Sequence, residues 1–465
     1  MKTRNNVIFL LFFLAGMMMG CQEEPIQEEA PELTQKVNKF IETAMSDVYL
    51  WYQEIPDIDI RYEFDSEEYF EKLLYTEDKW SFITDDVESL ENSFEGIEKS
   101  FGYSLAFGQF SNTGTIFAIV EFVYPNTPAD IAGLKRGNII VEMNNADITE
   151  DNYTDLLYAE SLTITLGILS GESISEGSKV SMTAQELNLD PVMITKVIEH
   201  GGHKIGYLFY AQYIDNYNTS LDNAFQYFLD QQITDLIVDL RYNPGGYTSA
   251  AQHLCSSVAP LSTVNANSTL VTFRWNDKYQ EYWEQEGMDD QLEIPFVSTV
   301  PVKLGLGKLY FLTGYGTASA SELSITGLKP YMDIVTIGDT TFGKYTASIT
   351  LKPEDLYEEE DDYSEFDNWG IQPIVIRYAN SEGVTDFKDG FAPDIPVYDD
   401  LWEGVQLGET QEPLLKAAIE DITGAEVLAL KKAKVKIPFT LFDRGFSKFD
   451  DNKRNLVFDG FLREK

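Results

Sequence analysis

The chain has 465 residues, of which 77 are acidic and 34 basic, and its formal net charge at pH 7 is −43. A chain of this length is expected to form about two to four domains. So acidic a protein is not expected to bind nucleic acid, because phosphate recognition requires a basic face. Without an internal run of roughly 18 apolar residues, no ordinary membrane-spanning helix is expected either.

The N-terminus predicts an export signal. Lys2 and Arg4 precede an apolar stretch over residues 7–19 that is too short to span a membrane comfortably. Gly20 and Cys21 follow, and a small residue before a cysteine at this place resembles a bacterial lipoprotein signal. The alternative is an ordinary secretory signal beside a chance cysteine.

The lipoprotein resemblance implies a signal peptide over residues 1–21 and a lipid on Cys21 that anchors the chain to a membrane of the bacterial cell envelope. Residues 22–35 are acidic and contain proline, which predicts a solvated tether. They also resemble the acidic export tag of Bacteroidetes surface lipoproteins. The only other cysteine, Cys255, lies in an apolar segment and is predicted to be a core residue.

Residues 36–95 are predicted to form a small helical unit, because apolar residues recur there at helical spacing. Trp51 and Trp80 are its expected anchors. From about residue 97 the pattern changes to short strands separated by glycine and proline.

The stretch TPADIAGLKRGNII, from Thr127 to Ile140, predicts a short helix that ends at Gly133 and a tight turn at Gly137 before a strand. It resembles the PDZ domains of bacterial periplasmic proteases, which implies a PDZ-like domain over residues 96–190. Its carboxylate-binding loop would be formed by Phe101, Gly102, Tyr103, Ser104 and Leu105. Successive backbone N–H groups of such a loop hold a peptide's terminal carboxylate while the peptide adds a strand to the sheet edge.

Strands alternate with helices over residues 191–425, which predicts an α/β layer with a largely parallel sheet. The expected strands cover residues 205–210, 235–240, 309–312 and 334–337, and the expected helices cover residues 221–229, 249–257 and 319–329. The acidic stretch 354–367 is interpreted as a solvated insertion rather than a metal site. Residues 426–465 are expected to be a C-terminal extension, either an added strand or a tail.

The motif GYGTASASE, residues 314–322, places a sharp turn between a buried strand and a helix that begins near Ser319. A hydroxyl at a helix N-terminus lies among unpaired N–H groups, where an oxyanion would be stabilised. The alternative is that Ser319 and Ser321 only cap the helix, with Glu322 completing a capping box.

A base for this serine is expected at Lys344, in the motif TTFGK that follows the next strand. Ser–Lys pairs are a known alternative to Ser–His pairs. A lysine acts as a base near neutral pH when burial disfavours its charged form; an ordinary surface lysine is the alternative. The three histidines, His200, His203 and His253, are expected to lie outside the site.

A third motif, DLRYNPGG at residues 239–246, runs from a strand into a Pro-Gly-Gly turn at the edge where α/β sheets place their sites. Gly245 and Gly246 could direct a backbone N–H at an oxyanion, although an ordinary turn would have the same sequence.

Together the three motifs resemble the C-terminal processing peptidases, or tail-specific proteases, over roughly residues 36–425. The resemblance implies a multi-domain α+β chain with a helical N-terminal part, a PDZ domain and an α/β peptidase core of the ClpP/crotonase-like kind. Its nucleophile would be Ser319, its general base Lys344, and its oxyanion donors the N–H groups of Ala320 and of Gly245 or Gly246. It also implies peptide or protein substrates and no metal or cofactor, with Ser321 as a structural residue.

Three positions depart from the family pattern. Other members place an aspartate after the nucleophile at the position where this chain has Pro330, with Asp333 nearby. Ser348 stands where many members have a glutamine that orients the lysine, so Ser348 is the possible orienting residue here. Tyr345 follows the lysine in place of glycine. Because the same core serves ligand binding in retinoid-binding relatives, the alternative function is a catalytically weak or inactive peptide-binding or scaffold lipoprotein.

Overall fold

The computed structural model describes residues 28–157, 159–171, 173–358, 362–427, 438–445 and 456–461. The predicted signal peptide, Cys21 and residues 22–27 of the predicted tether lie outside these residues. The end of the predicted tether, residues 32–35, is helical and so belongs to the N-terminal unit. Within the described part of the chain, no helix combines the length and apolar character needed to cross a membrane.

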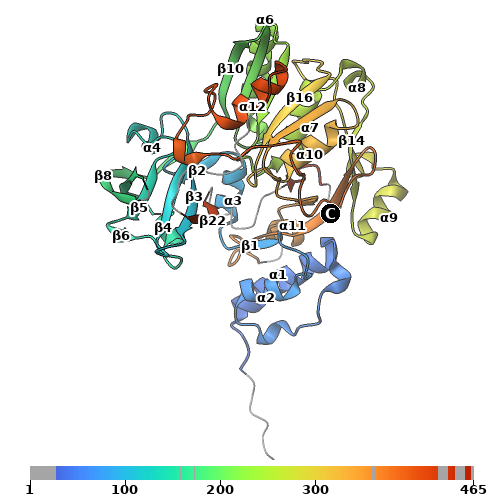
Figure 1. The fold of residues 1–465 in the computed structure, drawn as a ribbon. Helices are drawn as coiled ribbons and strands as arrows, with labels where there is room; N and C mark the ends of the chain where they lie inside the picture. Colours follow the sequence, from blue (N-terminus) through green and yellow to red (C-terminus); the bar gives the residue numbers. More distant parts are fainter. Residues whose placement is uncertain are drawn as a thin grey trace, which may run out of the picture.

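The N-terminal unit contains the helices α1 (Glu32–Val48), α2 (Ser66–Leu73) and α3 (Val87–Phe94), and Figure 1 shows α1 and α2 packed together at one end of the molecule. The apolar face of α1 is buried, as its spacing predicts. The prediction of a purely helical unit was incomplete, because β1 (Phe82–Thr84) pairs with β19 (Gly370–Gln372) far along the chain.

Residues 97–188, which we call the antiparallel domain, form most of a seven-stranded sheet with the order β22-β3-β4-β5-β7-β8, in which β6 pairs with β5. Its strands are β3 (Tyr103–Phe110), β4 (Ile116–Val123), β5 (Ile139–Met143), β6 (Ala146–Asp147), β7 (Ser161–Ser170), β8 (Ser173–Thr183) and β22 (Phe439–Gly445). The predicted short helix is α4 (Pro128–Ile131), which is capped by Thr127. Gly137 has a φ of +86°, and a Cβ there would lie 2.5 Å from Gly404 Cα, so the turn requires glycine.

The strands β2 (Ile97–Ser100) and β9 (Gln185–Asn188) pair at the two ends of this domain and lead into the core. The main core sheet has the order β10-β11-β12-β16-β17-β21. Its strands are β10 (Val192–His200), β11 (His203–Tyr210), β12 (Asp235–Asp239), β16 (Lys308–Thr313), β17 (Asp333–Gly338) and β21 (Ile395–Pro396). Pairing is parallel from β11 to β21, as predicted, and a hairpin joins β10 to β11 at His200 and His203.

The core helices are α6 (Asn218–Gln231), α7 (Thr248–Val258), α8 (Leu261–Asn265), α9 (Asp277–Glu286), α10 (Ala320–Leu328), α11 (Pro353–Leu356) and α12 (Pro413–Ile422), and α5 (Tyr153–Leu157) belongs to the antiparallel domain. Cys255 is buried in α7, which confirms it as a core residue.

A second core sheet, which the sequence did not predict, has the order β13-β23-β18-β20-β14-β15. Its strands are β13 (Gly246–Tyr247), β14 (Thr269–Arg274), β15 (Glu293–Pro295), β18 (Thr346–Ser348), β20 (Ile374–Asn380) and β23 (Leu456–Val457). Two of them adjoin predicted site motifs: β13 continues the Pro-Gly-Gly turn, and β18 begins two residues after Lys344.

Candidate active site

Ser319 is the residue that caps α10, at the carboxyl edge of the main core sheet. Its φ of +64° and ψ of −114° are unusual for a residue with a Cβ and imply local strain that the surrounding structure must hold. Its hydroxyl is buried, and no other described residue forms a hydrogen bond with it. Only half of the capping box exists, in which Glu322 Oε2 accepts from the N–H of Ser319 at 3.0 Å. The hydroxyl is therefore not used as a helix cap.

Lys344 is fully buried, and its amine also lacks a hydrogen-bond partner among the described residues. Burial lowers the pKa of Lys344 from 10.5 to about 7, against the opposing effect of the carboxylates of Asp78 and Glu322. An amine with such a pKa is largely neutral just above pH 7, which is what a general base requires.

Two side chains bind the backbones of Ser319 and Lys344 together. Glu322 Oε2 accepts from the N–H of Ser319 at 3.0 Å and from the N–H of Lys344 at 2.8 Å. On the carbonyl side, the hydroxyl of Tyr378 donates to Lys344 O at 2.9 Å and lies 3.3 Å from Ser319 O. The structure thus brings the serine and the lysine that the sequence proposed into one site.

The other oxygen of Glu322, Oε1, accepts from Gly343 N at 2.7 Å and from Thr341 Oγ1 at 2.6 Å. Burial raises the pKa of Glu322 to about 7, while these four donors act in the opposite direction. Because all four donors point at its oxygens, the geometry favours the ionised carboxylate. The sequence suggested Glu322 only as a capping partner, and it contained no signal for Tyr378.

The Pro-Gly-Gly turn lies against the serine loop. Asn243 O accepts from Ala318 N and from Ser321 Oγ, each at 3.1 Å, so Ser321 makes a structural contact. The N–H of Gly245 donates to Asn243 Oδ1 at 2.9 Å and is therefore already engaged. Gly246 has a φ of +135°, and a Cβ there would lie 2.0 Å from Tyr213 O, so only glycine fits. Ala320 is the first residue of α10, where an N–H has no acceptor inside the helix.

The orienting contact expected of Ser348 is not formed. Its hydroxyl donates to Gln372 Oε1 at 2.7 Å, on β19, and the Lys344 amine has no hydrogen-bond partner among the described residues. Asp333, another acid near the motif in sequence, begins β17 and therefore lies at the opposite end of that strand from the loop that carries Lys344.

Two family models match this chain. The model of the peptidase S41 N-terminal domain matches residues 36–82, and the model of peptidase family S41 matches residues 204–397. The chain belongs to peptidase family S41. The match to the peptidase model places it among the serine-type peptidases.

Individual relatives agree with this family. The chain is 25% identical over 317 residues to a carboxyl-terminal-processing protease of Synechocystis sp., covering 66% of each protein. It is 24% identical over 353 residues to a carboxy-terminal processing protease of Bacillus subtilis, covering 73% of this chain and 63% of the relative. The chain thus matches no more than about two thirds of the length of these curated relatives. A crystal structure of a Bacteroides fragilis protein assigned to the S41 proteases superposes with a TM-score of 0.67 at 26% identity, over 83% of this chain and 97% of that one.

The S41 N-terminal domain reaches the site at its last residues. The ring of Trp80 packs edge-on against Tyr345, the residue after the lysine, at 5.9 Å. Ser81 Oγ accepts from Ile374 N at 2.9 Å, and Asp78 is held by Tyr49 and Ser81. Tyr345 therefore joins the lysine loop to this domain, a contact that glycine could not make.

The predicted carboxylate loop lies at the start of β3. Gly102 has a φ of +78°, and its carbonyl accepts from Tyr124 N at 2.9 Å. Ser104 Oγ donates to Glu121 Oε2 at 2.8 Å, and the side chains of Tyr103 and Leu105 are buried. The edge of β3 beside this loop is already paired with β22, a strand of the chain's own C-terminal extension.

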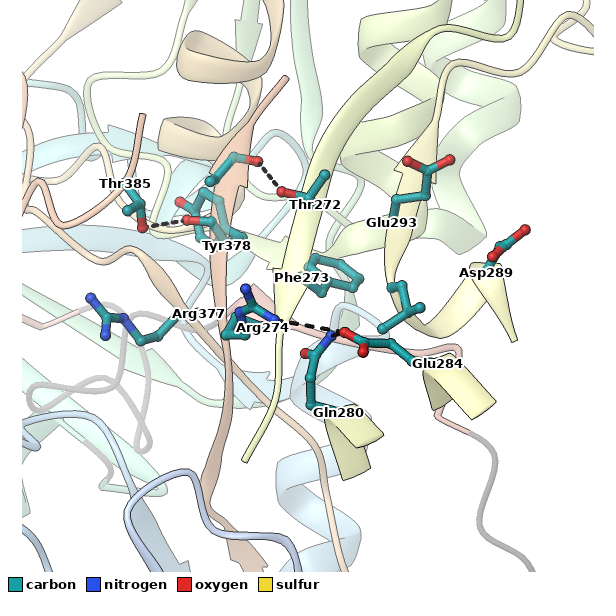
Figure 2. Close-up of a pocket in the computed structure, with 12 residues that line it drawn as sticks. Thr272, Phe273, Arg274, Gln280, Glu284, Asp289, Glu293, Arg377, Tyr378 and Thr385 are labelled. Atoms are coloured by element: carbon teal, nitrogen blue, oxygen red, sulfur yellow. Dashed lines mark hydrogen bonds and ion pairs between the residues drawn. The ribbon is translucent and has the colours of Figure 1, made fainter. Parts of the chain in front are cut away.

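Two cavities of this S41 peptidase are lined in part by residues of the site. One, of about 460 Å³, is lined by Thr341 and Phe342 of the lysine loop, by Tyr315 of the serine loop and by Trp80. Another, of about 700 Å³, opens on β14 and β20, where Phe273 and Tyr378 lie on neighbouring strands (Figure 2).

The histidines take no part in the site. His203 Nδ1 lies 2.7 Å from Asp235 Oδ2, and His253 Nε2 lies 2.8 Å from Asp222 Oδ1. His200 lies in the hairpin between β10 and β11. These pairs lie at the start of β12 and between α6 and α7, away from the serine and lysine loops.

Proposed function

We propose that this protein is a serine-type endopeptidase that cleaves peptides or protein C-terminal tails with Ser319 as nucleophile and Lys344 as general base. One observation carries the proposal: Glu322 and Tyr378 bind the backbones of both residues, while the hydroxyl and the amine are left without other partners. A buried polar group without a partner is costly, so an unpaired hydroxyl and an unpaired amine on two connected backbones point to a role other than stability.

In the proposed mechanism, neutral Lys344 takes the proton of Ser319 as Oγ attacks the scissile carbonyl carbon. The oxyanion that forms accepts hydrogen bonds from the N–H groups of Ala320 and Gly246. Lys344 then gives its proton to the leaving amine of the substrate. In the second step, the neutral Lys344 amine takes a proton from water, and the water attacks the acyl group and releases it from Ser319. This chemistry requires only groups of the chain itself.

The cavity beside the lysine loop is proposed to receive a substrate side chain. Its aromatic wall consists of Trp80, Tyr315 and Phe342. Two basic and two acidic residues also line it: Lys79, Lys388, Asp339 and Asp389. The aromatic wall suits an apolar or aromatic side chain.

The antiparallel domain is proposed to act as a PDZ domain that captures substrate tails, because the loop at Gly102 precedes the edge strand β3.

We also propose that lipidated Cys21 anchors the protein in the cell envelope. Labelling cells with a radioactive fatty acid tests the anchor, and the label should be absent from Cys21→Ser.

The catalytic proposal is tested by peptide hydrolysis with the chain that begins at residue 22. Ser319→Ala and Lys344→Ala are expected to lose activity, whereas the matched surface changes Ser262→Ala and Lys303→Ala are expected to retain it. Equal hydrolysis by all four variants would instead favour the second candidate, a peptide-binding module without catalysis. That candidate is suggested by the absence of a hydrogen bond between Ser319 and Lys344 in the described structure.

A further inference from the structure

The C-terminal extension pairs with the edge of the antiparallel domain. Strand β22 runs antiparallel to β3, with Phe439 opposite Phe110 and Gly445 opposite Leu105. Its downstream end therefore lies at the start of β3, beside the loop at Gly102. A peptide whose C-terminal carboxylate is bound by that loop would also run antiparallel to β3, in the direction of β22.

The extension then reaches the peptidase core. Strand β23 lies between β13 and β18, with Leu456 opposite Gly246 and Val457 opposite both Tyr247 and Ser348. Phe458 N donates to Ser348 O at 2.9 Å. The extension thus bridges the strand that continues the oxyanion turn and the strand that follows the base.

The side chains of Val457 and Phe458 pack against apolar and aromatic residues of the chain. Val457 is buried against Phe82, Leu90 and Phe94. The ring of Phe458 packs edge-on against Phe273 at 5.1 Å and against Trp275 at 5.7 Å.

Polar contacts fix the residues that follow. Thr248 Oγ1 donates to Asp459 Oδ1 at 2.7 Å, and Gln291 Nε2 donates to Gly460 O at 2.7 Å. A cavity of about 790 Å³ runs alongside, lined by Tyr247, Leu351 and Phe461 among others. Val457, Phe458 and Asp459 themselves form part of its lining, so there is space beside the segment for further residues of an extended chain.

We infer that residues 438–445 and 456–461 are a substrate-like ligand of the chain itself, which fills the peptide-binding edge of the antiparallel domain and a peptide channel of the peptidase core. The ligand class of this channel is an extended peptide with an aliphatic residue, then an aromatic residue, then an acid, as in Leu456-Val457-Phe458-Asp459. The inference rests on the proposed peptidase function, and it adds a substrate class and a regulation to the same site.

A ligand held in the same chain competes at a high effective concentration. The form described here is then a resting form, in keeping with the complete burial of Ser319 and Lys344. The apparent affinity for an external peptide is then the intrinsic affinity multiplied by the fraction of molecules whose channel is open.

The inference is tested by substitutions that weaken the attachment of β23, made in the chain that begins at residue 22. The double variant Val457→Asp/Phe458→Ala is expected to raise kcat/KM on an extended peptide by at least about tenfold, because a larger fraction of molecules is open. The matched control, Phe64→Ala at a phenylalanine that is 53% exposed, is expected to leave kcat/KM unchanged. Hydrogen exchange reports whether residues 456–461 are released. If they are released and kcat/KM stays constant or falls, β23 is a permanent strand of the fold and the inference is wrong.

A binding measurement separates this inference from the catalytic proposal. The probe is a fluorescent peptide LVFDGF, the sequence of residues 456–461, added to the double variant in a Ser319→Ala background. Saturable binding, weaker in Ser319→Ala alone and absent with a scrambled peptide, supports the channel even if no variant hydrolyses peptides. No binding at about 1 mM, the effective concentration of a short tether, overturns it even if Ser319 proves catalytic. A double variant that fails to fold would show no cooperative thermal unfolding. It would then be replaced by the single variant Phe458→Leu, for which a smaller increase of kcat/KM is expected.

Discussion

Two buried polar clusters lie at the carboxyl edge of the main core sheet, and they are built in opposite ways. In the first, all five N–H groups of Arg241 are paired, with Asp239, Asp399 and Glu412. Asp399 is also bound by Arg136, from the antiparallel domain, so the cluster joins the two domains. In the second, the hydroxyl of Ser319 and the amine of Lys344 have no such partners.

This difference distinguishes the structural role of one sequence motif from the reactive role of the other two. The Asp-Leu-Arg part of DLRYNPGG is a saturated network that fixes the turn, and saturated buried networks rigidify a fold. The serine and lysine are left unpaired, but their backbones are fixed by Glu322 and Tyr378. Fixed support around the reactive groups is what a preorganised site requires.

The largest effect is expected from Lys344→Met, which should lower kcat by about 10⁴-fold because the base is lost. The same change should stabilise the fold, on the order of 1–4 kcal/mol at pH 7, because a buried amine is replaced by an apolar group. Hydrolysis assays and chemical denaturation measure the two quantities. A stable but fully active variant would remove Lys344 from the mechanism.

Arg241→Met tests the saturated cluster. It leaves Asp239 and Glu412 buried without their cation, so the free energy of unfolding should fall by about 3–5 kcal/mol. Arg274→Met is the matched control, because the side chain of Arg274 is 70% exposed and stability should hardly change. Equal stability of the two variants in urea would show that the network is dispensable.

Glu322→Gln should lower kcat by roughly 10²-fold, since an amide cannot accept from all four donors and the two backbones are held less precisely in place. Loss of the negative charge also removes an interaction that raises the pKa of Lys344. The acid limb of the pH–rate profile should therefore move to lower pH, an effect that mere loosening would not produce. Glu286→Gln, on the exposed side of α9, serves as control.

The pH dependence of the wild-type enzyme gives a further test. Only the neutral amine acts as base, so kcat/KM should rise about tenfold per pH unit below pH 7 and level off above it. The folded pKa of about 7 lies below the unfolded value of 10.5, so the folded state binds fewer protons between these values, and stability should rise with pH across this window. Lys344→Met should remove both trends.

The smallest effect is expected from Tyr315→Ala at the cavity beside the lysine loop. Tyr315 is 55% exposed, so loss of its ring should raise KM by about three- to tenfold with little change in stability. Tyr227→Ala, an exposed tyrosine of α6, should change neither. An unaltered KM would place the substrate elsewhere.

Local sequence signals predicted the strands and helices of the core, because the apolar runs and the glycine turns there are strong. Ser319, Lys344 and the turn at Gly246 were predicted because their three motifs together resemble those of the C-terminal processing peptidases. Each motif alone also fits a helix cap, a surface lysine or an ordinary turn. Contacts between distant segments could not be read in this way: β1 and β23 have only three and two residues, too few to show a periodicity. Ser348 was assigned by its position in a motif, but its hydroxyl bonds to Gln372, which lies on another strand.

The pairing of β1 with β19 and of β23 with β13 has a consequence for folding. Residues near position 83 find their partners near position 371, and the last strand of the second core sheet comes from residues 456 and 457. Contacts this distant in sequence slow folding, because a long loop must close before they can form. Folding of the peptidase core is therefore expected to be slow, because β1 can complete its pairing only after a loop of several hundred residues has closed.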